Sequence, residues 1–143
     1  MTAFFETEDH RGLTGFYRES GLEIEDGWEK DMSPVYSVKL YDNGEFCGAA
    51  TVSRRFGIAV LDYIAVVRDR RKCGYGRMLL ENVRARMRSE NIIELYLTAK
   101  EPGFFKSQGA KETDRYTVLS DECENCLQYK ISCFPETMIL RCL

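Results

Sequence analysis

The sequence has few of the features that mark membrane-bound, secreted or nucleic-acid-binding proteins. It has no apolar stretch of the length that a transmembrane helix needs. Three acids, Glu6, Glu8 and Asp9, follow the first five residues, so we expect no signal peptide. Basic residues are not in excess, and the net charge of −3 gives no general attraction for nucleic acid. We expect a cytoplasmic protein with no membrane and no nucleic-acid partner.

Signs of a division into domains are also lacking. No repeat, low-complexity tract or linker rich in Pro, Gly and Ser interrupts the 143 residues, and the three prolines are scattered. A chain of this length can bury most of its surface in one core. We therefore expect a single domain over residues 1–143.

The hydrophobic pattern indicates helices first and strands after them. Helical spacing predicts helices over residues 8–20 and around 27–31. Runs rich in strand formers follow, at 35–41, 46–53 and 58–67. The first two of these runs are joined by Asp42-Asn43-Gly44-Glu45, a hairpin signal. Three successive antiparallel strands are therefore predicted.

A long amphipathic helix comes next. Its apolar stripe is formed by Met78, Leu79, Leu80, Val83 and Met87, which predicts a surface helix over residues 75–90. A strand over 92–98 then completes a βαβ crossover, which should be parallel. The remaining predicted elements are a short helix over 103–108 and strands over 115–120 and 137–143. The expected class is α+β, with a mixed, mostly antiparallel central sheet, a βαβ core and flanking helices.

A basic, glycine-containing loop separates the third strand from the long helix. Residues 68–72 hold four basic residues and one acid, and Gly74 and Gly76 follow. A helix N-terminus presents backbone N–H groups to anions, and glycines let the backbone approach phosphate oxygens. The loop lacks the lysine-serine pair of a P-loop and the spacing of a dinucleotide fingerprint. We interpret residues 71–76 as a pyrophosphate-binding loop.

Two segments resemble the signature of the GCN5-related N-acetyltransferase (GNAT) family. The first is residues 64–80, Ile-Ala-Val-Val-Arg-Asp-Arg-Arg-Lys-Cys-Gly-Tyr-Gly-Arg-Met-Leu-Leu, and the second is residues 103–110, Gly-Phe-Phe-Lys-Ser-Gln-Gly-Ala. The resemblance implies acetyl-CoA as donor. Its pantetheine would pair along the backbone of Ile64, Ala65 and Val66, where two strands splay apart. Its pyrophosphate would contact Arg71, Lys72, Cys73, Gly74, Tyr75 and Gly76, and Arg77 is a further candidate cofactor-binding residue.

The resemblance also implies a base and an acid, because direct attack of the acceptor amine on the thioester is usual in the family. Asp62 lies two residues before Ile64, where many relatives carry an acidic residue, and it is the candidate base. The alternative is that Asp62 pairs with a backbone amide or with an arginine such as Arg54.

The usual acid is missing. Phe105 stands where the family commonly has a tyrosine, and a phenyl ring cannot donate a proton. We expect Phe105 to pack against the cofactor. Tyr63, Tyr75 and Tyr96 are other tyrosines of the region, and none is assigned as the acid.

The first 34 residues carry nine acids against three bases. The resemblance implies that the first helices roof the acceptor pocket, so this negative field would attract a cationic amine, either a small molecule or a lysine side chain. A solvated acidic face is the alternative interpretation.

The C-terminal region concentrates cysteines. Cys123 and Cys126 form a C-x-x-C pair, followed by Cys133 and Cys142. Such a turn can place two thiolates on zinc, although a structural site needs four ligands. Cys123, Cys126 and Cys133 are therefore candidate metal ligands, with reduced thiols or a labile disulfide as the alternatives.

The sequence thus predicts an acetyl-CoA-dependent N-acetyltransferase that acts on a primary amine. A non-catalytic acyl-CoA-binding or regulatory module is the first alternative. A metal- or redox-responsive protein built on the same scaffold is the second. The oligomeric state stays open, with a homodimer as one option.

Overall fold

The computed structural model describes residues 1–55, 57–99, 102–113 and 136–142. These residues form one seven-stranded sheet of order β1-β2-β3-β4-β5-β7-β6. The strands are β1 (Thr2–Thr7), β2 (Pro34–Asp42), β3 (Glu45–Arg55), β4 (Ile58–Val66), β5 (Glu94–Ala99), β6 (Lys111–Glu112) and β7 (Glu136–Arg141). Only β4 and β5 pair in parallel, and the other neighbours are antiparallel. The predicted mixed, mostly antiparallel sheet is confirmed.

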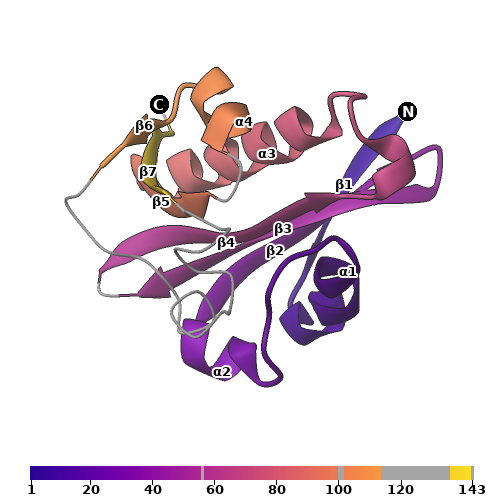
Figure 1. Cartoon of the computed structure of the whole chain (residues 1–143), viewed down its shortest axis with the longest axis horizontal. Helices are drawn as coiled ribbons and strands as arrows, with labels where there is room; N and C mark the ends of the chain where they lie inside the picture. The colour runs from indigo at the N-terminus through magenta and orange to yellow at the C-terminus, as the bar shows by residue number, and fades with distance from the viewer. Residues whose placement is uncertain (56, 100–101, 114–135, 143) are drawn as a thin grey trace.

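Helices cover both faces of this sheet. They are η1 (His10–Leu13), α1 (Thr14–Glu19), α2 (Trp28–Met32), η2 (Arg68–Arg70), α3 (Tyr75–Ser89) and α4 (Pro102–Ser107). Helices α3 and α4 lie on one face, and α1 and α2 lie on the other (Figure 1). The hydrophobic side chains divide accordingly into a large cluster under α3 and a smaller one under α1 and α2.

The apolar stripe of α3 explains the larger cluster. Leu79, Leu80, Val83 and Met87 are fully buried and pack on side chains of β2, β3, β5 and β7. Each such side chain contributes about 1.5–3 kcal/mol when it leaves water. The helix ends in basic residues, Arg86 and Arg88, which suit the negative end of its dipole.

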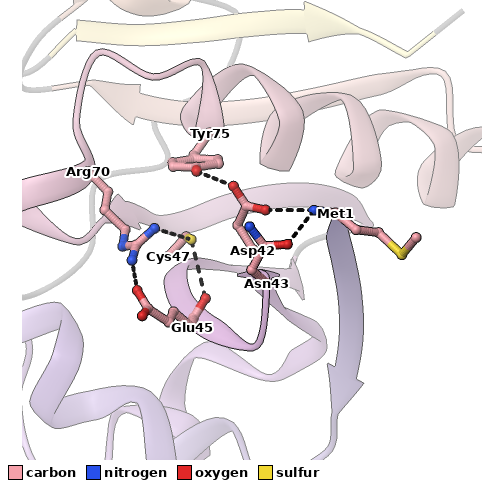
Figure 2. A network of polar contacts seen from close by, with 7 residues as sticks. All are labelled: Met1, Asp42, Asn43, Glu45, Cys47, Arg70 and Tyr75. Atoms are coloured by element: carbon pink, nitrogen blue, oxygen red, sulfur yellow. Dashed lines mark hydrogen bonds and ion pairs between the residues drawn. The ribbon is translucent and has the colours of Figure 1, made fainter.

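The hairpin between β2 and β3 follows its sequence signal. Asn43 and Gly44 both have positive φ, at 51° and 81°, as a two-residue turn with right-handed strand twist requires. The hairpin prediction is confirmed, and it holds Asp42 and Glu45 at the end of the sheet next to the start of α3 (Figure 2).

One strand was not predicted, one predicted helix differs in length, and one predicted strand falls outside the described residues. The strand β1 was not predicted, since Thr2–Thr7 shows no alternation of apolar and polar residues. The helix predicted over 8–20 is shorter, because the side chain of Asp9 accepts the N–H of Gly12 and starts a 3-10 turn before α1. The predicted strand over 115–120 lies outside the described residues.

Candidate active site

The strand β4 contains a β-bulge at Asp62. Leu61 pairs with Val52 of β3, whereas Tyr63 pairs with Thr51, so Asp62 is the extra residue. After the bulge, Tyr63 and Ala65 face the cluster under α1 and α2.

The side chains of Ile64 and Val66 face the cluster under α3. Their backbone groups point away from β3. The Val67 N–H donates to the Cys47 carbonyl at 2.8 Å, and alternate residues of an antiparallel strand turn their N–H and C=O groups to the same neighbour. Ala65 and Val67 therefore face β3, while Ile64 and Val66 face the opposite side.

On that opposite side, no described strand pairs with β4 beyond Leu61. The described pairing of β4 with β5 covers only residues 59–61 of β4, so the two strands part after Leu61. The N–H and C=O groups of Ile64 and Val66 border the resulting gap, which we call the open edge of β4. An extended chain of amides could hydrogen bond there as a further strand would.

The loop after β4 brings positive charge to this open edge. Arg71, Lys72, Cys73 and Arg77 are exposed, and the Nε of Arg71 donates to the Val66 carbonyl at 3.3 Å. The Cys73 thiol donates weakly to the Arg71 carbonyl at 3.7 Å.

The backbone of the loop is shaped for an anion. Lys72 and Gly74 have positive φ, at 66° and 85°, and Gly74 is the N-cap of α3 without a side-chain cap. The N–H groups of Tyr75, Gly76 and Arg77 occupy the first turn of α3, where no intrahelical carbonyl can accept them. Exposed cations and free amides thus converge at one end of β4, which fits a pyrophosphate.

The β2–β3 hairpin holds both ends of this loop, as Figure 2 shows. The Tyr75 hydroxyl donates to Asp42 at 2.5 Å. This bond raises the pKa of Tyr75 and lowers that of Asp42. Arg70 forms an ion pair with Glu45 and donates to the Cys47 thiol at 3.8 Å. The charge of Arg70 is therefore paired with Glu45 within the protein. The hydroxyl of Tyr75 is occupied by Asp42, so Tyr75 offers an anion its backbone N–H.

Asp62 lies in a tight polar cluster. The guanidinium of Arg55 donates to both carboxylate oxygens at 2.9 Å, and Ser53 also donates to the carboxylate. The side chains of Arg55 and Asp62 are 15% and 6% exposed. Such a bidentate, charge-assisted pair fixes the position of the carboxylate. The partner is Arg55, the neighbour of the arginine that the sequence suggested.

The two phenylalanines of α4 have different surroundings. Phe105 is 9% exposed and belongs to the cluster under α3, whereas Phe104 is 36% exposed. A Cβ on Gly76 would lie 3.4 Å from the Phe104 ring, so Phe104 covers the start of α3. The contact of Phe104 with the start of α3 was not predicted, because the position with a known role in the family motif is the next residue, Phe105.

The tyrosines near Asp62 are packed. Tyr63 donates to the Met32 sulfur at 3.6 Å and stacks on Tyr17 with ring centroids 5.1 Å apart. Tyr96 is buried with Val60 in a small cluster. Neither environment marks one of these hydroxyls as the missing acid.

The candidate metal ligands cannot be placed. Cys123, Cys126 and Cys133 lie outside the described residues. Within the described ranges, no group of three His, Cys, Asp or Glu side chains could hold a metal ion, and Cys47, Cys73 and Cys142 are free thiols.

No helix in the part of the chain that the structure describes is long and apolar enough to span a bilayer.

A parallel strand pair that ends early, followed by a basic loop at a helix N-terminus, is an arrangement that the pantetheine and pyrophosphate of acetyl-CoA would fit. Residues 3–110 match the model of the Acetyltransferase (GNAT) family, and the chain belongs to this family.

Relatives and solved structures agree with this assignment. An uncharacterized N-acetyltransferase of Chlorobaculum tepidum is 31% identical over 119 residues, which cover 80% of this chain and 77% of the relative. The ribosomal-protein-S18-alanine N-acetyltransferase of Escherichia coli has a similar fold, with a TM-score of 0.71 at 18% identity over 99% of this chain and 94% of that one. A GNAT acetyltransferase of Elizabethkingia anophelis, solved with acetyl-CoA bound, gives a TM-score of 0.72 at 12% identity over 98% and 97% of the two chains.

Proposed function

We propose that the protein transfers the acetyl group of acetyl-CoA to a primary amine by direct attack of the amine on the thioester. The observation that carries this proposal is the open edge of β4 at Ile64 and Val66, next to the exposed cations of residues 71–77. Pantetheine contains two amides, which suit the outward N–H and C=O groups of these two residues. The first-turn amides of α3 and the side chains of Arg71 and Lys72 suit the pyrophosphate.

A charge reversal tests the donor side. Lys72→Glu should weaken acetyl-CoA binding at least several-fold, because it replaces a cation with an anion beside the phosphates. Arg11→Glu makes the same change at an exposed position in η1 and should leave the affinity unchanged. The measurement is calorimetric titration with acetyl-CoA. Equal affinity of the two variants would contradict the assignment of the loop.

Within this proposal, Asp62 takes the proton of the acceptor ammonium. The neutral amine forms the new N–C bond as the C–S bond breaks, the second proton of its nitrogen passes to solvent, and the CoA thiolate takes a proton from solvent. Arg55 donates to both carboxylate oxygens at 2.9 Å, so the incoming proton competes with this pair for the carboxylate. Arg55 therefore acts as a positioning residue that sets how readily Asp62 accepts the proton.

The pH dependence of the rate tests Asp62. Asp62→Asn should lower kcat strongly and remove the acidic limb of the pH–rate profile. Arg55→Gln should move that limb to higher pH, because the carboxylate loses its cationic partner. Circular dichroism checks that both variants fold, since the pair is nearly buried. A profile of unchanged shape in Asp62→Asn would exclude Asp62 as the base.

The acceptor in this proposal is cationic. The Oε2 atom of Glu29 in α2 is shielded from solvent and has no hydrogen-bond partner in the described part of the chain. A buried carboxylate oxygen without a partner is costly, and an incoming ammonium would offset that cost. The neighbouring Asp26 is already paired with Arg18.

An amine panel tests the acceptor class and transfer itself. Polyamines, aminoglycosides, lysine peptides and neutral amines are incubated with acetyl-CoA, and products are identified by mass spectrometry. Cationic amines should react faster and lose rate as salt rises. Glu29→Gln should raise their KM, whereas the exposed control Glu25→Gln should not. Binding of acetyl-CoA without transfer to any amine would favour the non-catalytic alternative.

Zinc at Cys123, Cys126 and Cys133 and a cytoplasmic location stay predictions. Elemental analysis of the purified protein tests the metal, and absence of stoichiometric zinc or iron would exclude it.

A further inference from the structure

The strand β1 ends the sheet of the described residues and leaves one edge open. The Asn43 N–H of the neighbouring hairpin donates to the Met1 carbonyl at 2.9 Å. By the alternation of an antiparallel ladder, Ala3 and Phe5 also turn their backbone groups toward β2. The N–H and C=O groups of Thr2, Phe4 and Glu6 consequently point outward from the sheet.

This edge lacks the proline, lysine and bulge that commonly block edge pairing. Thr2–Thr7 contains no proline and no lysine, and its register with β2 has no bulge. Its two phenylalanines lie on opposite faces and are unusually exposed, Phe4 by 37% and Phe5 by 55%. An uninterrupted edge strand with exposed phenylalanines is a template for another strand.

A groove lies beside Phe5 on the face that carries α1. It has a volume of about 690 Å³, and its lining includes Met1, Ala3, Phe5, Lys39, Tyr41 and Gly44. The Phe5 ring contacts Tyr41 edge to face, with centroids 5.4 Å apart. The exposed Phe5 ring is thus part of the groove wall, and Ala3 borders the same groove two residues earlier on the strand.

We propose that β1 pairs antiparallel with β1 of a second copy of this chain, across a two-fold axis that passes between Phe4 and the partner's Phe4. A two-fold axis perpendicular to the sheet places the α1 faces of both copies on one side and the α3 faces on the other. An even-numbered residue of β1 can therefore lie opposite only an even-numbered residue, and an odd-numbered residue opposite only an odd-numbered one. Centring the pairing on Phe4 places Thr2 opposite the partner's Glu6 and gives every outward N–H and C=O of Thr2, Phe4 and Glu6 a partner. Centring it on Ala3 or Phe5 leaves one outward residue beyond the end of the facing strand.

The side chains agree with the same register. Ala3 lies opposite the partner's Phe5 at a non-hydrogen-bonded position, where facing Cα atoms are about 4.5 Å apart. A small residue there leaves space for a large one, and the partner's Phe5 enters the groove bounded by Ala3, Tyr41 and Gly44. No two like charges face each other, since Glu6 opposes a threonine and is paired with Arg86 in its own chain. The edge of β1 and the groove beside it thus complement the same features of a second copy, so we take a second copy of the chain as the partner of this edge.

The molar mass in solution tests the proposal. Light scattering across a concentration series should show the chain, of 16.5 kDa, shifting to twice that mass. Phe4→Lys places two ammonium groups opposite each other at the axis and should give a monomer. Ile93→Lys makes the same change at a residue that is 45% exposed and remote from β1, and it should leave the dimer intact. A wild-type chain that stays monomeric, or a dimeric Phe4→Lys variant, would overturn the proposal.

Ala3→Phe gives an independent variant in case Phe4→Lys does not fold. Its added ring meets the partner's Phe5, so it should also give a monomer. A dimer of this variant would overturn the proposal as well.

Disulfide cross-linking tests the register. Phe4→Cys brings two thiols to a pair with Cα atoms about 5.5 Å apart, within disulfide range. Phe5→Cys leaves the thiols too far apart. Under oxidation, Phe4→Cys should run as a dimer on a non-reducing gel, above the background of wild-type protein with its exposed Cys73. Preferential cross-linking of Phe5→Cys would refute the register.

Discussion

A proline at position 66 would test the open edge of β4 most directly. The Val66 N–H points away from β3, so replacing it with a proline nitrogen removes no bond of the β3–β4 ladder. Proline is tolerated in a strand where its missing N–H faces outward. The carbonyl of residue 66 remains available to Arg71. The main polar group that the substitution deletes is the donor assigned to the cofactor.

The expected loss follows from one hydrogen bond. A typical bond contributes about 0.5–1.5 kcal/mol net, which corresponds to a rise in Kd for CoA of about 2- to 13-fold. Proline also removes part of the valine side chain, which packs against the α3 cluster. Val66→Ala shortens the same side chain and keeps the N–H, so it is the matched reference.

Two measurements decide the outcome. Calorimetric titration should give weaker CoA binding for Val66→Pro than for Val66→Ala, and thermal melts should give similar stability for both. Ala65→Pro serves as the opposite control, because the Ala65 N–H faces β3 and its loss breaks the ladder. Equal CoA affinity of the two Val66 variants would refute the cofactor contact. A Val66→Pro melt as low as that of Ala65→Pro would refute the backbone orientation.

Two further predictions concern stability. Gly48→Ala should lower the free energy of unfolding by about 1–3 kcal/mol and Tm by several degrees, because the new Cβ would lie 2.5 Å from the Ala65 carbonyl oxygen and 3.0 Å from Leu79. Gly15→Ala, whose Cβ would have nothing within 4 Å, should not lower Tm. Equal melting temperatures of the two variants would contradict this packing. His10 bonds to Ser37 at 2.7 Å, and burial lowers its pKa below 6.5 despite the nearby carboxylates of Asp9, Glu8 and Glu6. The unfolded chain then binds more protons at mildly acidic pH, so stability should fall as pH drops below about 6.5. Urea melts at pH 5 and 8 should show this loss in the wild type and a smaller one in His10→Gln, and identical losses would exclude His10 as its source.

Local sequence signals predicted much of the fold. The Asp42-Asn43-Gly44-Glu45 turn, the stripe of α3 and the parallel β4–β5 pair depend on residues close together in the chain, and the structure contains all three. The strand β1 escaped prediction because an edge strand buries neither face fully, so Phe4 and Phe5 adjoin without alternation.

Contacts between strands escaped prediction for a different reason. The bulge at Asp62 depends on the register of β3 and β4, and nothing in either strand alone specifies it. The same register decides that Arg55 holds Asp62, whereas the sequence pointed to its neighbour Arg54. The exposed position of Phe104, beside the buried Phe105, likewise depends on how α4 packs against α3.

Because of the bulge at Asp62, the number of residues between Asp62 and Arg68 is also constrained. Side chains and backbone groups of a strand alternate with a period of two. Deleting one residue between Asp62 and Arg68 would turn the amides now bordering the gap toward β3 and move apolar side chains to the wrong face. Conservative substitutions within 63–66 should therefore be tolerated far better than any single-residue insertion or deletion.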